Sequence, residues 1–123
     1  MKQITRSFED YLEEILICEK KYKFVKAVNL ASSMGISRPA VAKMLKALEL
    51  EGFIIREKNC IILSKQGRLV AEKVYQKHLT IKEFLLQIGV GKDNAEVDCC
   101  KIEHCISNET FNAIKKFMDK KGE

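Results

Sequence analysis

The chain has 123 residues with a formal net charge of +5, and 46% of its side chains are hydrophobic. This length allows a modest core, as in one domain or two small lobes that share contacts. No stretch approaches the roughly 18 uninterrupted apolar residues of a membrane-spanning helix. The N-terminal residues also lack the apolar run of a secretory signal. We therefore expect a cytoplasmic protein with no membrane association.

The cysteines indicate a reducing environment. There are five, which is an odd number, and no two of them are spaced as CxxC. This pattern argues against a secreted disulfide framework and against a structural zinc knuckle. We expect reduced thiols.

Positive charge is concentrated in the middle of the chain. Residues 1–19 carry two basic and five acidic side chains, residues 20–73 carry twelve and four, and residues 74–123 carry eight of each. A basic block between acidic or neutral flanks is typical of a nucleic-acid-binding module, because neutralising phosphates supplies most of the non-specific affinity. The alternative is that these lysines only solvate helix surfaces, and the motifs must decide.

The first predicted element is an amphipathic helix that ends near Lys20. Its apolar stripe is formed by Phe8, Leu12, Ile15 and Leu16. Asp10 and Glu13 stand one turn apart on another face of this helix. Acidic residues at the start of a helix usually only complement the helix dipole, so these two become candidate ligands only in combination with residues further along.

A helix, a glycine turn and a second helix follow. Residues 25–34 are typical of a short helix that Gly35 closes in a tight turn. Ser37 can cap the next helix, and Pro39 suits its first turn, where the missing N–H has no cost. Apolar residues at helical spacing then continue to Gly52. This order predicts a helix-turn-helix, with an ordinary helical hairpin as the alternative.

The next segment predicts a wing. Residues 53–64 contain two runs rich in β-branched side chains around a polar turn at Lys58 and Asn59. In winged helices the start of the second helix of the motif enters the major groove, and the hairpin lies against the DNA backbone. The candidate DNA-contacting residues are therefore Ser37, Arg38, Pro39, Ala40, Lys43, Lys46, Arg56 and Lys58.

The remaining sequence predicts a helical lobe. Ser64 can cap a long helix over residues 65–88, which Gly89 ends, and shorter helices are expected over residues 94–105 and 107–120. So many large apolar side chains in about fifty residues suggest that this lobe also forms a two-fold dimer, matching a palindromic operator in double-stranded DNA. The predicted fold is mainly α, with a winged helix-turn-helix domain over residues 1–64 and a helical metal-binding and dimerisation domain over residues 65–123.

The lobe contains half of a metal site. In a helix, Cys100, Glu103 and His104 stand at i, i+3 and i+4, so a thiol, a carboxylate and an imidazole share one face. Partners could come from the first helix and from the other histidine of the chain. The candidate metal ligands are therefore Asp10, Glu13, His78, Cys100, Glu103 and His104, a set that would tie the first helix to the last third of the protein.

The whole chain resembles the diphtheria toxin repressor and manganese transport regulator (DtxR/MntR) family of metal-activated repressors, in its shorter, two-domain form. The resemblance covers residues 7 to about 118. It rests on the order and spacing of EDYLEEI at 9–15, SRP at 37–39, LSKQG at 63–67 and CKIEHCIS at 100–107. It implies that the family's ligand positions fall on the six candidate residues above.

The resemblance leaves the metal open between Mn²⁺ and Fe²⁺. Manganese-type members carry carboxylates at the positions of Asp10 and Cys100, whereas iron-type members carry methionine and cysteine there. A hard carboxylate suits Mn²⁺, and a thiolate suits Fe²⁺ or, adventitiously, Zn²⁺ and Ni²⁺. Iron-type members also have a carboxylate serving an additional site at the position of Lys82, so the resemblance implies that this site is altered here.

The expected function is metal-dependent repression that controls metal homeostasis, with the cation holding the first helix against the dimer scaffold. A thiol redox regulator that uses Cys99, Cys100 or Cys105 is the alternative, although vicinal cysteines form at best a strained disulfide. An enzyme is not expected. The sequence has no nucleophile with a neighbouring base and no glycine-rich phosphate loop.

Overall fold

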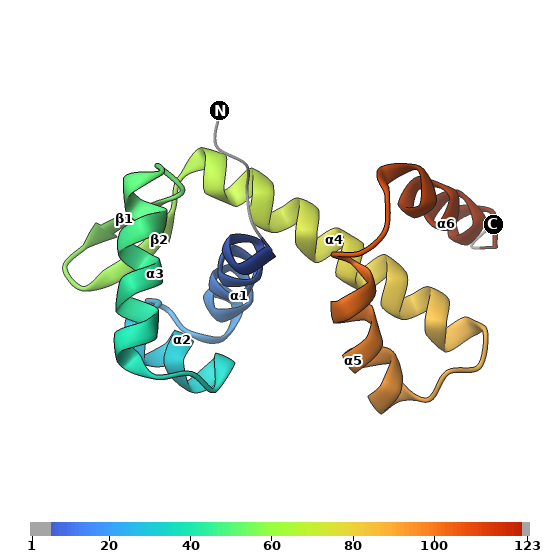
Figure 1. Cartoon of the computed structure of the whole chain (residues 1–123), viewed down its shortest axis with the longest axis horizontal. Helices are drawn as coiled ribbons and strands as arrows, with labels where there is room; N and C mark the ends of the chain where they lie inside the picture. The colour runs from blue at the N-terminus through green and yellow to red at the C-terminus, as the bar shows by residue number, and fades with distance from the viewer. Residues whose placement is uncertain (1–5, 122–123) are drawn as a thin grey trace. The chain divides into compact units, whose positions relative to one another are not determined.

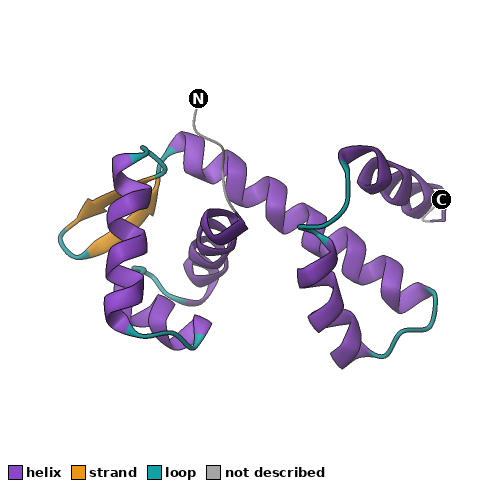
Figure 2. Ribbon diagram, in the orientation of Figure 1, coloured by secondary structure: helices purple, strands orange, loops and turns teal. Residues whose placement is uncertain are grey.

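The protein is mainly helical, as predicted (Figures 1 and 2). A computed structural model describes residues 6–121. Among these residues, no helix combines the length and the hydrophobicity that a bilayer crossing requires. The elements in chain order are α1 (Arg6–Lys21), α2 (Ala27–Met34), α3 (Arg38–Leu50), β1 (Ile54–Glu57), β2 (Cys60–Leu63), α4 (Lys65–Gln87), α5 (Lys92–Ile102) and α6 (Asn108–Lys121).

The chain divides into two compact units, residues 1–73 and 74–123. The division falls inside α4, whereas the sequence analysis placed the domain boundary at residues 64 and 65. The first turns of α4 therefore pack with the N-terminal unit, and its remaining turns belong to the C-terminal unit.

The helix-turn-helix has the predicted local chemistry. Gly35 adopts the left-handed conformation, with φ of 66°, where an L side chain is disfavoured. Ser37 is the N-cap of α3, and its hydroxyl accepts a hydrogen bond from the Ala40 N–H at 3.3 Å. Pro39 lies in the first turn of α3, where it sacrifices no helical hydrogen bond. These residues set where α2 ends and where α3 begins.

The wing is a two-stranded antiparallel hairpin in which Glu57 pairs with Cys60. The two residues between them, Lys58 and Asn59, have positive φ values of 51° and 66°. Such a pair is typical of the tight turns that match the twist of a hairpin. The Ile61 N–H donates to the Val25 carbonyl at 2.8 Å, which attaches the hairpin to the segment before α2.

The core of the N-terminal unit forms where α1 and α3 present their apolar faces. Three of the four residues predicted for the stripe of α1 are buried, and Phe8 packs edge-to-face on Phe53 at 6.3 Å between ring centroids. The side chains with no exposed surface here include Leu12, Ile15, Leu30, Val41, Leu45 and Leu48.

The start of α4 is fixed to the turn that follows α3. The Ser64 hydroxyl donates to the Gly52 carbonyl at 2.6 Å and accepts from the Gly67 N–H at 3.0 Å. Helix α4 also approaches the backbone of Phe53 very closely, because a Cβ on Gly67 would lie 1.9 Å from the Phe53 carbonyl oxygen. Only glycine fits at position 67, which gives a physical reason for the LSKQG motif.

The C-terminal unit packs α5 and α6 on the second part of α4. Its core consists of Ile81, Leu85, Ala95 and Cys99. Ser107 caps α6 through a hydrogen bond from the Thr110 N–H at 3.1 Å.

The prediction that the helix before α6 extends to Cys105 was wrong, because α5 ends at Ile102. The Glu103 N–H still bonds to the Cys99 carbonyl four residues back, but the His104 N–H bonds to Lys101, three residues back. The chain therefore tightens into a turn at the residues that sequence analysis had placed on a helix face.

We predict that Gly67→Ala lowers the free energy of unfolding by about 1–3 kcal/mol, because the new methyl group overpacks against the Phe53 carbonyl. Urea denaturation followed by circular dichroism measures this loss. Gly91→Ser is a suitable control, since Gly91 is the N-cap of α5, has an extended conformation and has open space around its Cβ position. Equal stability of the Gly67→Ala and wild-type proteins would contradict the close approach.

Candidate metal centre and nucleic-acid interface

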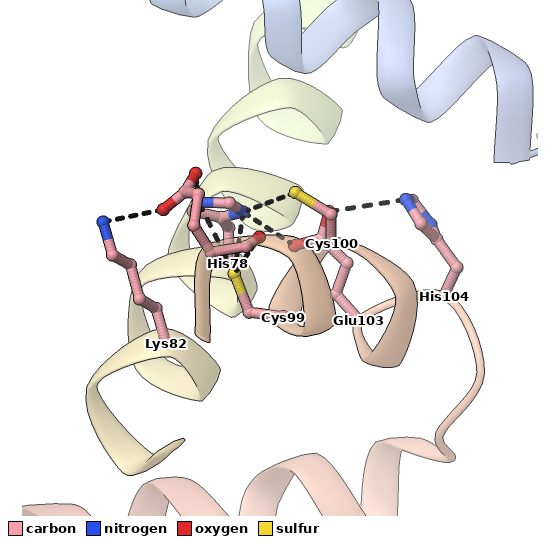
Figure 3. A network of polar contacts seen from close by, with 7 residues as sticks. His78, Lys82, Cys99, Cys100, Glu103 and His104 are labelled. Atoms are coloured by element: carbon pink, nitrogen blue, oxygen red, sulfur yellow. Dashed lines mark hydrogen bonds and ion pairs between the residues drawn. The ribbon is translucent and has the colours of Figure 1, made fainter. Parts of the chain in front are cut away.

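Five potential ligands gather in the C-terminal unit (Figure 3). His78 projects from α4, Cys99 and Cys100 lie in the last turn of α5, and Glu103 and His104 follow in the turn after that helix. These residues are close because α5 packs on α4 and its last turn lies beside His78. The cluster contains imidazole nitrogens, thiols and a carboxylate, which are the donor types that transition metals use in proteins.

Glu103 lies between the two imidazole rings. Its Oε2 is 3.5 Å from Nδ1 of His78, and its Oε1 is 3.4 Å from Nε2 of His104. The residue is only 4% exposed, and within the described residues neither carboxylate oxygen accepts a hydrogen bond. A buried carboxylate without hydrogen bonds is costly unless positive charge lies beside it. That charge can come from a protonated imidazole or from a metal cation that binds Glu103 and the rings together.

The turn after α5 produces this arrangement. Glu103 occupies the C-cap position of α5 with helical φ and ψ, so it keeps its place one turn after Cys99 and Cys100. The tighter turn at His104 then places that ring next to the Glu103 carboxylate. Cys100 and Glu103 therefore share one face, as predicted, because both keep helical geometry. His104 reaches the same side of the molecule through the turn instead.

His78 is oriented by a charged pair that sequence analysis did not assign to the site. Its Nε2 lies 3.2 Å from Oε1 of Glu96, and Oε2 of Glu96 accepts from Nζ of Lys82 at 2.7 Å. The hydrogen bond from Lys82 is the main reason that the pKa of Glu96 is lowered and that the pKa of Lys82 is raised. An ionised Glu96 favours a proton on Nε2 of His78, which leaves Nδ1 facing the cluster as an acceptor.

Lys82 therefore has a definite partner. The resemblance placed it where iron-type repressors have a carboxylate, and here its ammonium group neutralises Glu96. The signal for this pair was present in the sequence, because Lys82 stands one turn after His78 and Glu96 one turn before Cys100. Without knowledge of how α4 and α5 cross, it could not be distinguished from other exposed pairs.

The two vicinal thiols are equally distant from His78. The Sγ atoms of Cys99 and Cys100 each lie 3.6 Å from its Nδ1. Cys100 is exposed, whereas Cys99 has no exposed surface, and burial, followed by the neighbouring Cys100, raises the pKa of the Cys99 thiol to about 12. Sequence analysis proposed Cys100 as a ligand but considered Cys99 only for redox chemistry.

The six predicted metal ligands are divided between the two units. Four of them, His78, Cys100, Glu103 and His104, form the connected set of contacts described above. Asp10 and Glu13 lie one turn apart on α1 of the N-terminal unit.

The candidate nucleic-acid interface lies on α3 and the wing. All eight residues predicted to contact DNA are exposed, and the first turn of α3 has no acidic residue that would repel phosphates. Ser37 also caps α3, so its hydroxyl has a structural role in addition to any contact with DNA. The interface therefore combines an accessible helix N-terminus with five basic side chains on α3 and the wing, namely Arg38, Lys43, Lys46, Arg56 and Lys58.

Comparison with known families accounts for nearly the whole chain. Residues 3–60 match the family described as "Iron dependent repressor, N-terminal DNA binding domain". Residues 64–122 match "Iron dependent repressor, metal binding and dimerisation domain". The first match contains the helix-turn-helix and most of the wing, and the second contains the whole ligand cluster.

Individual transcriptional regulators are also similar in sequence to this chain over most of its length. An uncharacterised HTH-type transcriptional regulator of Methanocaldococcus jannaschii is 36% identical over 120 residues, which are 95% of this chain and 96% of that protein. The transcriptional regulator MntR of Escherichia coli O157:H7 is 33% identical over 93% of this chain and 74% of its own length.

Solved structures have the same fold. The manganese regulator SloR has a TM-score of 0.80 at 29% identity, and the metal-dependent transcriptional regulator MtsR has a TM-score of 0.85 at 27% identity. Each comparison covers 91% of this chain and 53% of the other, so the chain spans about half the length of these two proteins.

A winged helix-turn-helix followed by a helical unit with clustered potential metal ligands defines a class of DNA-binding transcriptional regulators rather than of enzymes. Within that class, the chain belongs to the DtxR/MntR family of iron-dependent repressors.

We predict that iodoacetamide modifies Cys100 and Cys105 in the folded protein well before it modifies Cys99. Both Cys100 and Cys105 are exposed, whereas Cys99 is buried and, with a pKa of about 12, remains protonated at both neutral and mildly alkaline pH. Mass spectrometry of the alkylated peptides gives the order, and a urea-denatured sample, in which all three should react alike, is the control. Modification of Cys99 in the folded protein as fast as that of Cys105 would contradict the described packing.

Proposed function

We propose that the protein is a cytoplasmic transcriptional repressor that Mn²⁺ or Fe²⁺ activates and that controls metal homeostasis. The observation that carries the proposal is the buried Glu103 carboxylate between two imidazole nitrogens, in a sequence that matches a metal-binding and dimerisation domain. A divalent cation satisfies both carboxylate oxygens and both rings more fully than a proton on one ring does.

In this proposal the cation also binds Asp10 and Glu13 of α1. The support is chemical, because carboxylates complete the coordination of hard divalent metals, and the family resemblance places ligands at both positions. Without metal, these carboxylates, Glu103 and a Cys100 thiolate repel one another. The cation reverses this effect and fixes α1 to the C-terminal unit, which sets the separation of the two α3 helices, one from each protomer of a dimer.

The energetic consequence is a coupling between metal and DNA. Metal raises operator affinity only to the extent that it prefers the DNA-binding arrangement, typically about 1–3 kcal/mol or roughly 5- to 150-fold. The same factor applies in reverse, so operator DNA tightens metal binding.

The choice between Mn²⁺ and Fe²⁺ depends on two positions. Asp10 supplies a hard oxygen donor and Cys100 a soft sulfur donor, so the set fits either ion. Solved relatives include the manganese regulator SloR and a ScaR structure with bound Zn²⁺. In this proposal Zn²⁺ and Ni²⁺ bind at these ligands only adventitiously.

A homodimer on a palindromic operator completes the scheme. Several large apolar side chains of the C-terminal unit are exposed, and the matching family description assigns dimerisation to this region. Burying them between two copies gives the dimer a two-fold axis, which a palindromic site in double-stranded DNA mirrors. These side chains are Leu79, Ile88, Val97 and Phe117.

Thiol redox regulation is the second candidate, and the exposure of Cys100 and Cys105 is the observation that favours it. Peroxide would then change operator binding with no metal present. Variants that remove only an imidazole separate the two candidates, because a redox switch does not need His104.

We predict that His104→Ala gives a folded dimer whose operator affinity no longer rises with Mn²⁺ or Fe²⁺, because one ring beside Glu103 is lost. Anaerobic fluorescence anisotropy with operator DNA, with and without metal, measures the effect against a gain of roughly 5- to 150-fold in the wild type. Lys101→Ala changes an exposed residue in the same region and should keep the gain. Full activation of the His104→Ala protein by metal would refute this scheme.

We predict that Arg56→Ala weakens binding to all DNA sequences to a similar degree, because a wing residue contacts phosphates rather than bases. The slope of log K against log salt concentration should become about one unit less steep. Titrations at several salt concentrations give the slope, and Lys92→Ala removes an equal charge from an exposed position at the start of α5 as a control. An unchanged slope for Arg56→Ala would place the wing away from the DNA backbone.

A further inference from the structure

The geometry around His78 fits a second kind of cation. Zinc binds thiolate sulfur at about 2.3 Å and imidazole nitrogen at about 2.0–2.1 Å, and with tetrahedral angles these bonds separate S from N by about 3.6 Å. The Sγ atoms of Cys99 and Cys100 are each 3.6 Å from Nδ1 of His78. All three donor atoms lie within 4.8 Å of one another. Both sulfur–nitrogen separations therefore match those of a tetrahedral zinc site.

The imidazole is also held in the orientation that such a site needs. Glu96 accepts at Nε2 of His78 and is itself held by Lys82, so the ring proton is held on Nε2 and the lone pair of Nδ1 is the one that can bind a cation. Sγ of Cys99 also lies 3.7 Å from Nε2, so this thiol must shift slightly toward Nδ1 to share a cation with it. A carboxylate on the far nitrogen of a ligating histidine fixes its tautomer and raises its basicity. Lys82 and Glu96 thus act as positioning residues for Nδ1.

We propose that Cys99, Cys100 and His78 bind a thiophilic divalent cation, Zn²⁺ or Cd²⁺, with Cys99 as a ligand and water at the fourth position. This inference deepens the proposed metal centre and rests on it, because the two ligand sets share His78 and Cys100. The sets differ in the remaining donors. The hard-metal set adds oxygen ligands, including those of α1, whereas the thiophilic set adds the sulfur of Cys99 and lies wholly in the C-terminal unit.

A thiophilic cation at these residues would affect regulation. A cation held only by residues of the C-terminal unit makes no bond to Asp10 or Glu13, so it occupies His78 and Cys100 without fixing α1. Such a cation competes with Mn²⁺ or Fe²⁺ and gives little activation. The vicinal thiols would then let the protein distinguish metals in two ways, by how tightly each metal binds and by how much each metal raises operator affinity.

Cys99 could instead be only a core residue. It has no exposed surface, it packs with Ile81, Leu85 and Ala95, and its thiol donates to the Glu96 carbonyl at 3.3 Å. Buried cysteines commonly behave as small hydrophobic residues of this kind. The experiment must therefore separate a sulfur that binds metal from one that only packs.

Cd²⁺ titration of the full-length protein, followed by ultraviolet Cd–thiolate charge-transfer absorption, makes this distinction. Removing one of two sulfur ligands in Cys99→Ala should reduce the absorption per bound Cd²⁺ to about half and weaken Cd²⁺ binding at least about tenfold. Cys105→Ala, which removes an exposed thiol outside the set, should behave like the wild type. Wild-type absorption and affinity in Cys99→Ala would overturn the inference.

Two further measurements remain informative if Cys99→Ala folds poorly. X-ray absorption of the wild-type Cd²⁺ complex should count two sulfur ligands per ion, and a count of one would overturn the inference. The double variant Asp10→Asn and Glu13→Gln should keep wild-type Cd²⁺ absorption and affinity, and loss of both would also overturn it. Mn²⁺-dependent operator binding by the same double variant tests the proposed function separately, since that activity should be lost.

Discussion

The functional account depends on one electrostatic constraint, the buried Glu103 carboxylate between the imidazoles of His78 and His104. A buried carboxylate between two imidazole rings is stabilised most when positive charge, from a ring proton or a cation, lies among the three groups. A cation that binds all three groups is the simplest source of that charge. The nearby thiols extend the set of donors, and the metal specificity then depends on which of these donors the ion engages.

A few local features of the fold position the candidate DNA-contacting helix and the ligand cluster. Gly35 and Ser37 define the turn that presents the start of α3, and Ser64 with Gly67 seats the start of α4 on the turn after that helix. In the C-terminal unit, α5 packs on α4 through apolar residues and ends just before Glu103. Regular helix geometry therefore positions His78 and the thiols, and a tight turn positions His104.

Much of the fold could be predicted from the sequence because the residues that specify its turns and helix ends are adjacent in the chain. A glycine turn, a serine cap and a two-residue hairpin turn are encoded by adjacent residues, and the helix-turn-helix and wing were found where predicted. The roles of Cys99 and Glu96 were missed, since they depend on how α4 and α5 cross. The end of α5 was also missed, because no glycine or proline marks it and only the hydrogen bonds show the change of turn.

The most direct test of the central claim is a crystal structure of the Mn²⁺-loaded protein with anomalous scattering data. The account predicts an anomalous peak within bonding distance of a Glu103 carboxylate oxygen and of at least one imidazole nitrogen of His78 or His104, with an oxygen from Asp10 or Glu13 in the same coordination sphere. An ion bound elsewhere, with Glu103 outside its coordination sphere, would contradict the account.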